Sequence, residues 1–245
     1  MELNGKVAVI TGGGTGIGRA TALLLARRGV DVVVNYSRSR KEAESTVEEI
    51  RALGRKAVAV RSDISKAEQA EELMQQAVKS LGRLDILVNN AGWTAFVDFK
   101  DMDDLTDEMW EHTYGVNVKG PFYCIRAAAR HMTKPGAIVN VSSLAAALAK
   151  GSSIAYCASK AALNVVTRAT ARVLAPDIRV NAVAPGVVRT RWVADQKAFV
   201  RGAELQTPMR RVAEPEDVAQ VIVALIADSD FVTGQIIAVD GGIGV

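Results

Sequence analysis

The stretch that decides the fold lies near the amino terminus and reads Thr11-Gly12-Gly13-Gly14-Thr15-Gly16-Ile17-Gly18. It follows an apolar run and opens a segment of helical period. Gly12 permits a tight turn, Gly16 lets backbone approach a pyrophosphate, and Gly18 allows a helix to pack closely on a strand. The alternative is a glycine-rich turn without a ligand, but packing alone would then give no evident reason for three glycines at these positions. We therefore predict a dinucleotide cofactor, contacted here by Gly12, Thr15, Gly16, Ile17 and Gly18.

Short apolar runs alternate with longer amphipathic segments from this turn to the carboxyl end. The expected strands are 6–11, 31–35, 57–61, 84–89, 137–142, 178–184 and 236–240. The expected helices include 18–28, 41–53, 67–81 and 154–174. Because strand–helix alternation implies a parallel sheet covered on both faces, we predict an α/β fold. Its seven-stranded parallel sheet would be doubly wound, as in the Rossmann fold.

Length and composition favour one domain. A chain of 245 residues with 49% hydrophobic content can bury one sizeable core. No linker or low-complexity tract divides it, so residues 1–245 are predicted to form a single catalytic domain. Residues 187–211 have no clean period and precede a helix expected to begin near Glu214-Pro215. We interpret this segment as a long substrate loop or lid.

The charge balance and the cysteines exclude several classes of protein. A net charge of +3 is a slight excess rather than a polybasic surface, which argues against nucleic acid. Cys124 and Cys157 follow no metal-ligand spacing, so no metal site is expected. The amino terminus has no signal-like pattern, and no apolar run approaches the roughly 20 residues that cross a bilayer. We expect a soluble, cytoplasmic protein without nucleic-acid or membrane partners.

The end of the second expected strand indicates which cofactor is preferred. An acid there would bond the ribose hydroxyls of NAD and repel the 2′-phosphate of NADP. The chain instead reads Asn35-Tyr36-Ser37-Arg38-Ser39-Arg40, with no acid. We therefore predict NADP(H) over NAD(H), with Ser37 and Arg38 nearest the phosphate. A solvated basic start to the next helix is the alternative.

Three residues have the chemistry of a proton-transfer site. Tyr156 and Lys160 are four residues apart, which places them on one helix face roughly 6 Å apart. A free tyrosine has a pKa of about 10, and a nearby ammonium would lower it. Tyr156 could then donate a proton to a carbonyl oxygen, or accept one from an alcohol, while Ser143 bonds the same oxygen. A Tyr-x-x-x-Lys pair alone is common on helix surfaces.

Taken together, these motifs resemble the single-domain short-chain dehydrogenase/reductases, from about Gly5 to Gly242. The matching elements, in order, are the glycine stretch 11–18, Asp63, Asn89-Asn90-Ala91-Gly92, Asn117, Ser143, Tyr156 with Lys160, Pro185-Gly186 and Thr190. The resemblance implies an oxidoreductase that interconverts a carbonyl and an alcohol by hydride transfer, with Asn117, Ser143, Tyr156 and Lys160 as its catalytic set. Asn117 would lie in a kinked helix and hold a water that relays protons from Lys160. A non-catalytic dinucleotide-binding protein is the alternative from another class.

The resemblance also assigns the rest of the cofactor site. Asp63 and Ile64 would bond and flank the adenine ring. The nicotinamide half would be bounded by residues that follow three later strands, which are Asn90, Ala91, Gly92, Tyr156, Lys160, Pro185, Gly186, Val188 and Thr190. Part of the role of the Asn89–Gly92 stretch is expected to be structural.

Within the family the chain looks most like the 3-oxoacyl-[acyl-carrier-protein] reductases, which suggests a 3-oxoacyl-thioester substrate. Two departures argue against a carrier protein. Leu174-Ala175-Pro176-Asp177 lacks the expected basic residues, and Arg189-Thr190-Arg191-Trp192 lacks the usual acids. Another small alcohol, ketone or sugar is the alternative substrate.

The predicted loop 187–211 carries a local excess of four positive charges. An anionic substrate, a solvated lid or a subunit contact would each explain it. Trp93 and Trp192, with Phe96 and Phe199, are predicted to line an apolar substrate pocket, and core or interface packing is the alternative. The resemblance further implies a homotetramer, with the helices near Asn117 and Tyr156 at one contact and the carboxyl-terminal strand at another.

Overall fold

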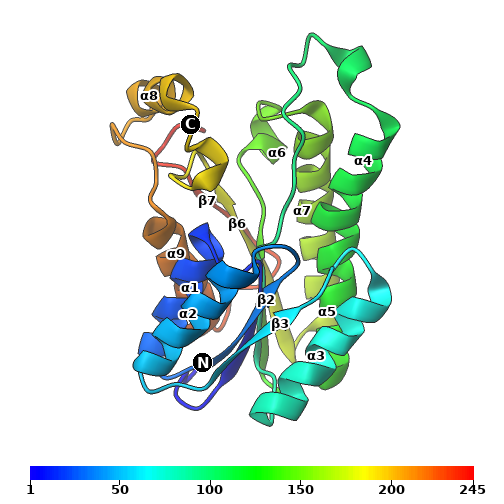
Figure 1. The fold of residues 1–245 in the computed structure, drawn as a ribbon, viewed down its shortest axis with the longest axis vertical. Coiled ribbons are helices and arrows are strands. Elements are labelled where there is room, and N and C mark those ends of the chain that lie inside the picture. Colours follow the sequence, from blue (N-terminus) through cyan, green and yellow to red (C-terminus); the bar gives the residue numbers. More distant parts are fainter.

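One parallel sheet runs through the molecule (Figure 1). The computed structural model describes residues 1–245, and the strand order is β3-β2-β1-β4-β5-β6-β7. The strands are β1 (Val7–Thr11), β2 (Asp31–Tyr36), β3 (Ala57–Arg61), β4 (Ile86–Asn89), β5 (Gly136–Val141), β6 (Ile178–Pro185) and β7 (Ile236–Val239). All neighbouring pairs are parallel. The predicted doubly wound, seven-stranded sheet is confirmed, with strand ends shifted by one or two residues.

Helices cover both faces of this sheet (Figure 1). One layer holds α1 (Gly16–Arg27), α2 (Arg40–Ala52) and α9 (Pro215–Ala227). The other holds α3 (Ala67–Leu81), α4 (Asp107–Tyr114), α5 (Gly120–His131) and α7 (Ile154–Leu174). No helix is long and apolar enough to span a bilayer.

Alternate strand residues explain why the strands are apolar throughout. Ile10 and Val34 belong to the core under α1 and α2, whereas Val9 and Val33 belong to the core under α3 and α5. Successive side chains of a strand point to opposite faces, so a sheet covered on both sides needs apolar residues at every position. The sheet is thereby held rigidly between two cores, and its carboxyl edge is a fixed platform for a site.

The segment 187–211 differs from its prediction. It is not an irregular loop throughout, because it contains the short 3-10 helix η3 (Arg191–Val193) and the helix α8 (Lys197–Gln206). α8 buries only Val200 and Ala203, which pack in a small cluster with Val212. Because only two of its residues are buried and the stretch is strongly basic, the sequence of α8 has no clear apolar repeat of helical period. The helix expected near Glu214-Pro215 is α9, and its first turn has a capping box between Glu214 and Asp217.

Asp85, which directly precedes β4, joins β1 and β4 at their amino ends. Its carboxylate is fully buried, accepts a hydrogen bond from the Val7 amide at 3.0 Å, and pairs with Arg83 at 2.7 Å. Lys6 lies 3.5 Å away. Asp85 therefore ties the strand that leads to the glycine turn to its neighbour.

We expect Asp85→Ala to lower the free energy of unfolding by about 3 kcal/mol, because it leaves buried donors without an acceptor. Urea denaturation measures the change. Glu48→Ala is the matched control, since it removes an exposed i,i+3 pair with Arg51 that contributes at most about 1 kcal/mol. Equal losses in the two variants would contradict the assignment.

Candidate active site

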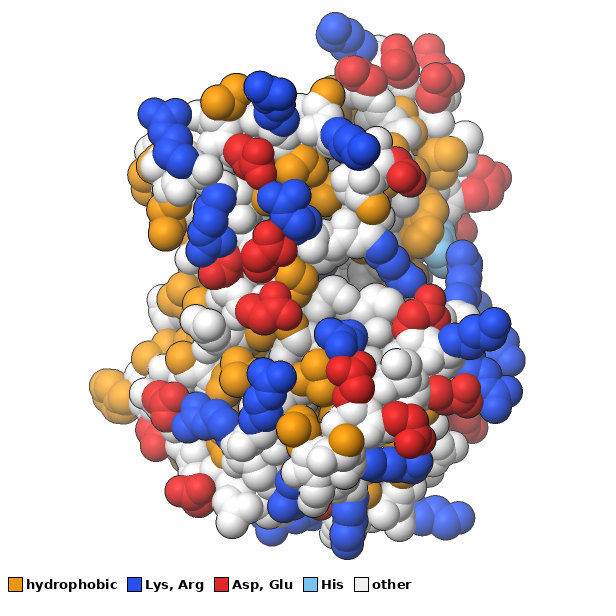
Figure 2. Space-filling view, turned by 60° about the vertical axis from the view of Figure 1, so that its left-hand side comes forward, with side chains coloured by type: hydrophobic (Ala, Val, Ile, Leu, Met, Phe, Trp, Pro, Cys, Tyr) orange, Lys and Arg blue, Asp and Glu red, His pale blue; other side chains and the backbone are white.

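A cleft of about 1440 Å³ opens at the carboxyl edge of the sheet. Residues that follow each of the strands β1 to β6 line it. The strand order reverses between β1 and β4, and such a switch point is where doubly wound folds bind ligands. The volume exceeds that of a pocket for one small molecule. Figure 2 shows a recess on one face of the molecule with Lys and Arg side chains beside it, while charges of both signs are interspersed over the rest of that face.

The glycine turn has the geometry of an anion cradle. Gly12 and Gly16 have φ values of +62° and +52°, in the left-handed region that side chains rarely adopt. A Cβ at Gly16 would lie 3.2 Å from Cγ2 of Thr190, across the cleft. The N-cap Thr15 makes no side-chain cap, and the first turn of α1 has no acid, so its amides have no intrahelical or capping acceptor. These features fit a pyrophosphate at the amino end of α1.

Two glycines of the stretch, Gly14 and Gly18, are also required for packing. Gly18 does not line the cleft, and a Cβ there would lie 2.5 Å from Asn90 Nδ2 and from the Gly12 carbonyl. The predicted packing role of Gly18 agrees with the structure, and its direct contact with a cofactor stays a prediction. A Cβ at Gly14 would lie 2.8 Å from the Ala43 amide of α2, a constraint that the sequence did not indicate.

The residues after β2 and β3 lie at the other end of the cleft. Ser37 and Arg38 line it as predicted, and both are exposed. Arg38 has no carboxylate partner, whereas Arg40 pairs with Glu44 at 2.7 Å. Asp63 and Ile64 also line the cleft, and the Asp63 carboxylate accepts hydrogen bonds from the amide and hydroxyl of Ser65.

The stretch after β4 braces the cradle. The Asn90 amide nitrogen Nδ2 donates to the Thr11 and Gly12 carbonyls, at 3.0 Å each. The Asn90 and Ala91 backbone amides both donate to Oγ1 of Thr11, also at 3.0 Å. Asn90, Ala91 and Gly92 nevertheless line the cleft. They can thus hold the cradle and bound a ligand together.

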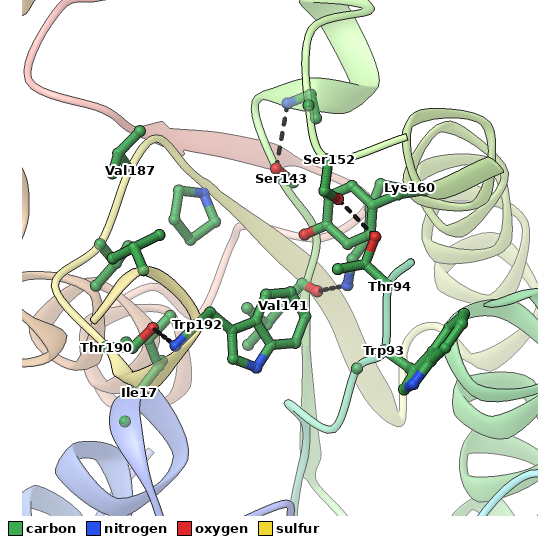
Figure 3. A pocket seen from close by; sticks show the side chains of 18 of the residues that line it. Ile17, Trp93, Thr94, Val141, Ser143, Ser152, Lys160, Val187, Thr190 and Trp192 are labelled. Carbon is green, nitrogen blue, oxygen red and sulfur yellow. Dashed lines mark hydrogen bonds between the residues drawn. The ribbon is translucent and has the colours of Figure 1, made fainter. Parts of the chain in front are cut away.

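Ser143, Tyr156 and Lys160 all line the cleft, where Figure 3 shows Ser143 in the segment after β5 and Lys160 on α7. The helix α7 begins at Ile154. The side chain of its N-cap residue, Ser153, accepts a hydrogen bond from the Tyr156 amide at 3.2 Å. Lys160 Nζ lies 5.7 Å from the Tyr156 ring centroid. It donates to the Val141 carbonyl at 2.8 Å. The predicted constellation is therefore brought together by the strand end of β5 and one turn of helix.

Burial shifts the pKa values of both groups away from their ordinary ranges. Desolvation lowers the pKa of Lys160 to about 8, and no carboxylate opposes this. Desolvation also raises the pKa of Tyr156 to about 12, against a smaller lowering by a hydrogen bond with Ser143. The sequence led us to expect a Tyr156 pKa lowered by Lys160. In the structure burial is the largest cause acting on the phenol and raises its pKa, so the expected lowering is wrong and Tyr156 is protonated at neutral pH.

Asn117 lies behind the cleft rather than in its wall. The helix is kinked there as predicted, because a π-helical turn, η2 (Gly115–Lys119), joins α4 to α5. The Asn117 side chain accepts from the Trp93 amide and donates to the Trp93 carbonyl, both at 2.9 Å, and donates to Ser159 at 3.0 Å. Its side chain joins η2, the segment after β4, and α7. It therefore positions the cleft from behind.

The residues after β6 form the opposite wall. Pro185, Gly186, Val188 and Thr190 all line the cleft. Thr190 caps η3 by accepting a hydrogen bond from the Trp192 amide at 3.4 Å. Arg191 then donates to Ser39, the residue before α2, at 3.0 Å. Neither partner of this bridge across the cleft was predicted as a site residue, because they are 152 residues apart in the chain.

Aromatic side chains line the same cleft as Ser143, Tyr156 and Lys160. Trp192 projects into the cleft between the wall after β6 and Lys160 (Figure 3), and its ring centroid lies 6.1 Å from that of Tyr156. Trp93 packs edge-on against His112 at 4.6 Å. Phe96 and Phe199 are half-exposed and line the same cleft. The four predicted aromatics are thus together at its mouth, and sequence reasoning missed Thr94 and Ser152, whose hydroxyls share a hydrogen bond beside them.

Known proteins share this fold and sequence over their full length. Residues 12–244 match the family model described as Enoyl-(Acyl carrier protein) reductase. The L-rhamnose 1-dehydrogenase (NAD(P)(+)) of a Sphingomonas species is 38% identical, over 98% of this chain and 96% of that protein. A short chain dehydrogenase from Burkholderia cenocepacia, solved in complex with NADP, is 34% identical with a TM-score of 0.94 over all of both chains. The promiscuous reductase LugOII, which catalyses keto-reduction at C1 during lugdunomycin biosynthesis, is 37% identical with a TM-score of 0.92, also over all of both chains.

Proposed function

The chain belongs to the short-chain dehydrogenase/reductase family of oxidoreductases, and we propose that it reduces a carbonyl to a secondary alcohol, or the reverse, with NADP(H) and with Tyr156 as the proton donor. The observation that carries this proposal is the placement of Ser143, Tyr156 and Lys160 in one cleft with an uncapped helix end. A dinucleotide-binding protein without turnover would not need a buried ammonium beside a buried phenol. The non-catalytic alternative is therefore disfavoured.

The cofactor is assigned to residues from both halves of the cleft. The α1 amino end, with Gly12, Thr15, Gly16 and Ile17, would hold the pyrophosphate. Ser37 and Arg38 would meet the 2′-phosphate, and the absence of an acid after β2 supports NADP(H) over NAD(H). The NADP complex of the Burkholderia cenocepacia relative gives independent support.

Hydride transfer is the chemistry that the nicotinamide supplies when bound. The chain's own part is to place and protonate the substrate oxygen. Tyr156 would donate its phenol proton to that oxygen, Ser143 would donate a hydrogen bond to it, and Lys160 would stabilise the phenolate left behind. The alcohol then carries the added hydride on carbon and the Tyr156 proton on oxygen. In the oxidative direction Tyr156 accepts that proton.

A ketone of moderate size is the substrate class that the mouth of the cleft favours. Trp93, Trp192, Phe96 and Phe199 offer apolar walls near Tyr156. The keto-reduction catalysed by LugOII is consistent with such a substrate. A 3-oxoacyl thioester also fits a long apolar mouth, and the name of the Sphingomonas relative favours a sugar as the second candidate.

A homotetramer is the proposed assembly. Val165 and Val173 on α7 are strongly exposed, as are Phe231 and Val245 near the carboxyl end. Exposed apolar side chains at these two places support the two contacts that the family resemblance implies.

Replacing Tyr156 with Phe tests the proposed acid. We expect the kcat/KM for NADPH-dependent reduction, measured over a panel of ketones, 3-oxoacyl thioesters and sugars, to fall by about a hundredfold or more. NADP⁺ affinity by calorimetry should stay within about twofold, because the phenol's proton is not needed to hold the nucleotide. Tyr114→Phe, on α4 outside the cleft, is the control. Undiminished turnover in Tyr156→Phe would overturn the mechanism.

The pH dependence should report Lys160. Its ammonium is present below pH 8 and is lost as the pH rises through the lowered pKa of about 8, while Tyr156, with a pKa of about 12, stays protonated over this range. We expect kcat for reduction at saturating NADPH to be highest below pH 8 and to fall above it. In Lys160→Arg the guanidinium stays charged, so the residual activity should not fall near pH 8. A wild-type rate that rises through this region would contradict the role of Lys160.

The position of Trp192 predicts an effect on selectivity. Trp192→Ala should change the ratio of kcat/KM between a bulky aromatic ketone and a small aliphatic one by about tenfold, because the indole forms one wall beside Tyr156. Trp110→Ala, which removes an aromatic outside the cleft, is the matched control. Parallel kinetics across the whole panel would indicate that Trp192 packs the loop without touching substrate.

A further inference from the structure

The two arginines that line the cleft, Arg38 and Arg191, have no carboxylate partner. Two arginines close to them in the chain, by contrast, are paired with acids. Arg40 pairs with Glu44 at 2.7 Å, and Arg189 pairs with Glu204 and Glu214 at 2.8 Å each. A guanidinium in a cleft without an acid is an open site for an anion. Arg38 was assigned from the sequence, whereas Arg191 belongs to the opposite wall.

Arg191 already reaches across to the β2 end of the cleft. Its Nη1 donates to the hydroxyl of Ser39 at 3.0 Å, which places it beside the Ser37–Arg38 pair. Ser39 is the N-cap residue of α2, yet its hydroxyl caps no amide of that helix. Thr190 fixes the base of the bridge by packing near Gly16 and capping η3. Arg191 therefore reaches from the wall after β6 to the residue that follows Arg38, and both arginines line the cleft.

We propose that Arg191 is a second ligand for the 2′-phosphate of NADP(H), contributed by the substrate loop, and that it sets cofactor preference together with Arg38. This inference rests on the proposed use of a dinucleotide. On binding, Arg191 exchanges a neutral hydroxyl acceptor for a phosphate carrying a charge of about −1.5 to −2 at neutral pH, a stronger charge-assisted bond. The 2′-hydroxyl of NAD(H) offers no such exchange. The bridge thus links cofactor identity to the position of the loop that bears Trp192.

Two acids of this region, Asp63 and Glu42, form no ion pair with either arginine of the cleft. Asp63 lines the cleft, but its carboxylate accepts from Ser65 and makes no ion pair with either arginine. Glu42, in the first turn of α2, makes no ion pair. An anion entering between Arg38 and Arg191 therefore meets two cations and the hydroxyls of Ser37 and Ser39.

The test is nucleotide binding by calorimetry, with 2′,5′-ADP and 5′-AMP as probes, because neither requires turnover. Wild type should bind 2′,5′-ADP more tightly than 5′-AMP. Arg191→Gln should weaken 2′,5′-ADP by about tenfold, equivalent to about 1.4 kcal/mol, and leave 5′-AMP within about twofold. The salt dependence of 2′,5′-ADP binding should also become shallower, as one ionic contact is lost. Arg201→Gln, an exposed arginine of the same loop that does not line the cleft, should change neither affinity.

Two outcomes overturn the inference without touching the reaction. Equal weakening of both probes in Arg191→Gln would mean that Arg191 orders the loop, and unchanged binding of both would mean that it only anchors Ser39. The variant Arg38→Gln distinguishes these two outcomes from the case in which the protein does not prefer NADP(H) at all. If wild type binds the two probes equally, and Arg38→Gln changes neither, the preference for NADP(H) itself is wrong while the Tyr156 mechanism stands.

Discussion

The cross-brace between Thr11 and Asn90 is the interaction on which the site depends. Two neighbouring parallel strands diverge at this point, because the chain leaves β1 toward one face and β4 toward the other. Thr11 Oγ1 accepts hydrogen bonds from the backbone amides of Asn90 and Ala91, and the Asn90 side chain donates to the carbonyls of Thr11 and Gly12. These bonds satisfy polar groups that the sheet ladder no longer pairs. The divergence becomes a rigid crevice, whose depth is set by glycines that leave no Cβ in the way.

The proposed catalytic residues are held by a second brace behind that crevice. A π-helical turn directs Asn117 inward, where one amide group engages the backbone of Trp93 and the hydroxyl of Ser159. Ser159 lies one residue before Lys160, so the brace joins the floor of the cleft to the helix that carries Tyr156. Lys160 in turn bonds the last residue of β5. A buried lysine without a carboxylate is costly, and this hydrogen bond is its only fixed partner in the structure.

The sequence predicted the sheet, the cradle and the proposed catalytic set because each follows a local rule. Apolar runs of strand length, glycines at a turn, and a four-residue spacing on α7 are all visible without knowledge of contacts. The misses are non-local. The close packing of Gly18 against Asn90, which lies 72 residues further along the chain, is a contact that the glycine motif does not name. The pKa of Tyr156 was predicted to fall, because the spacing to Lys160 is readable while the burial of the phenol is not. Helix α8 escaped prediction since it buries two side chains only.

The division between scaffold and loop explains where specificity can reside. The proposed proton transfer depends on Ser143, which follows β5, and on Tyr156 and Lys160 of α7. The segment after β6 is braced weakly, since its small cluster is built around three buried residues. Yet it carries Thr190, Arg191 and Trp192, which face three successive parts of the cleft: the cradle, the Ser39 corner and the Tyr156 ring. Substitutions there can alter selectivity at little cost to the core, because few buried contacts depend on them. Reaction type is therefore set by the rigid elements, and the choice of cofactor and substrate is open to change in a single short turn.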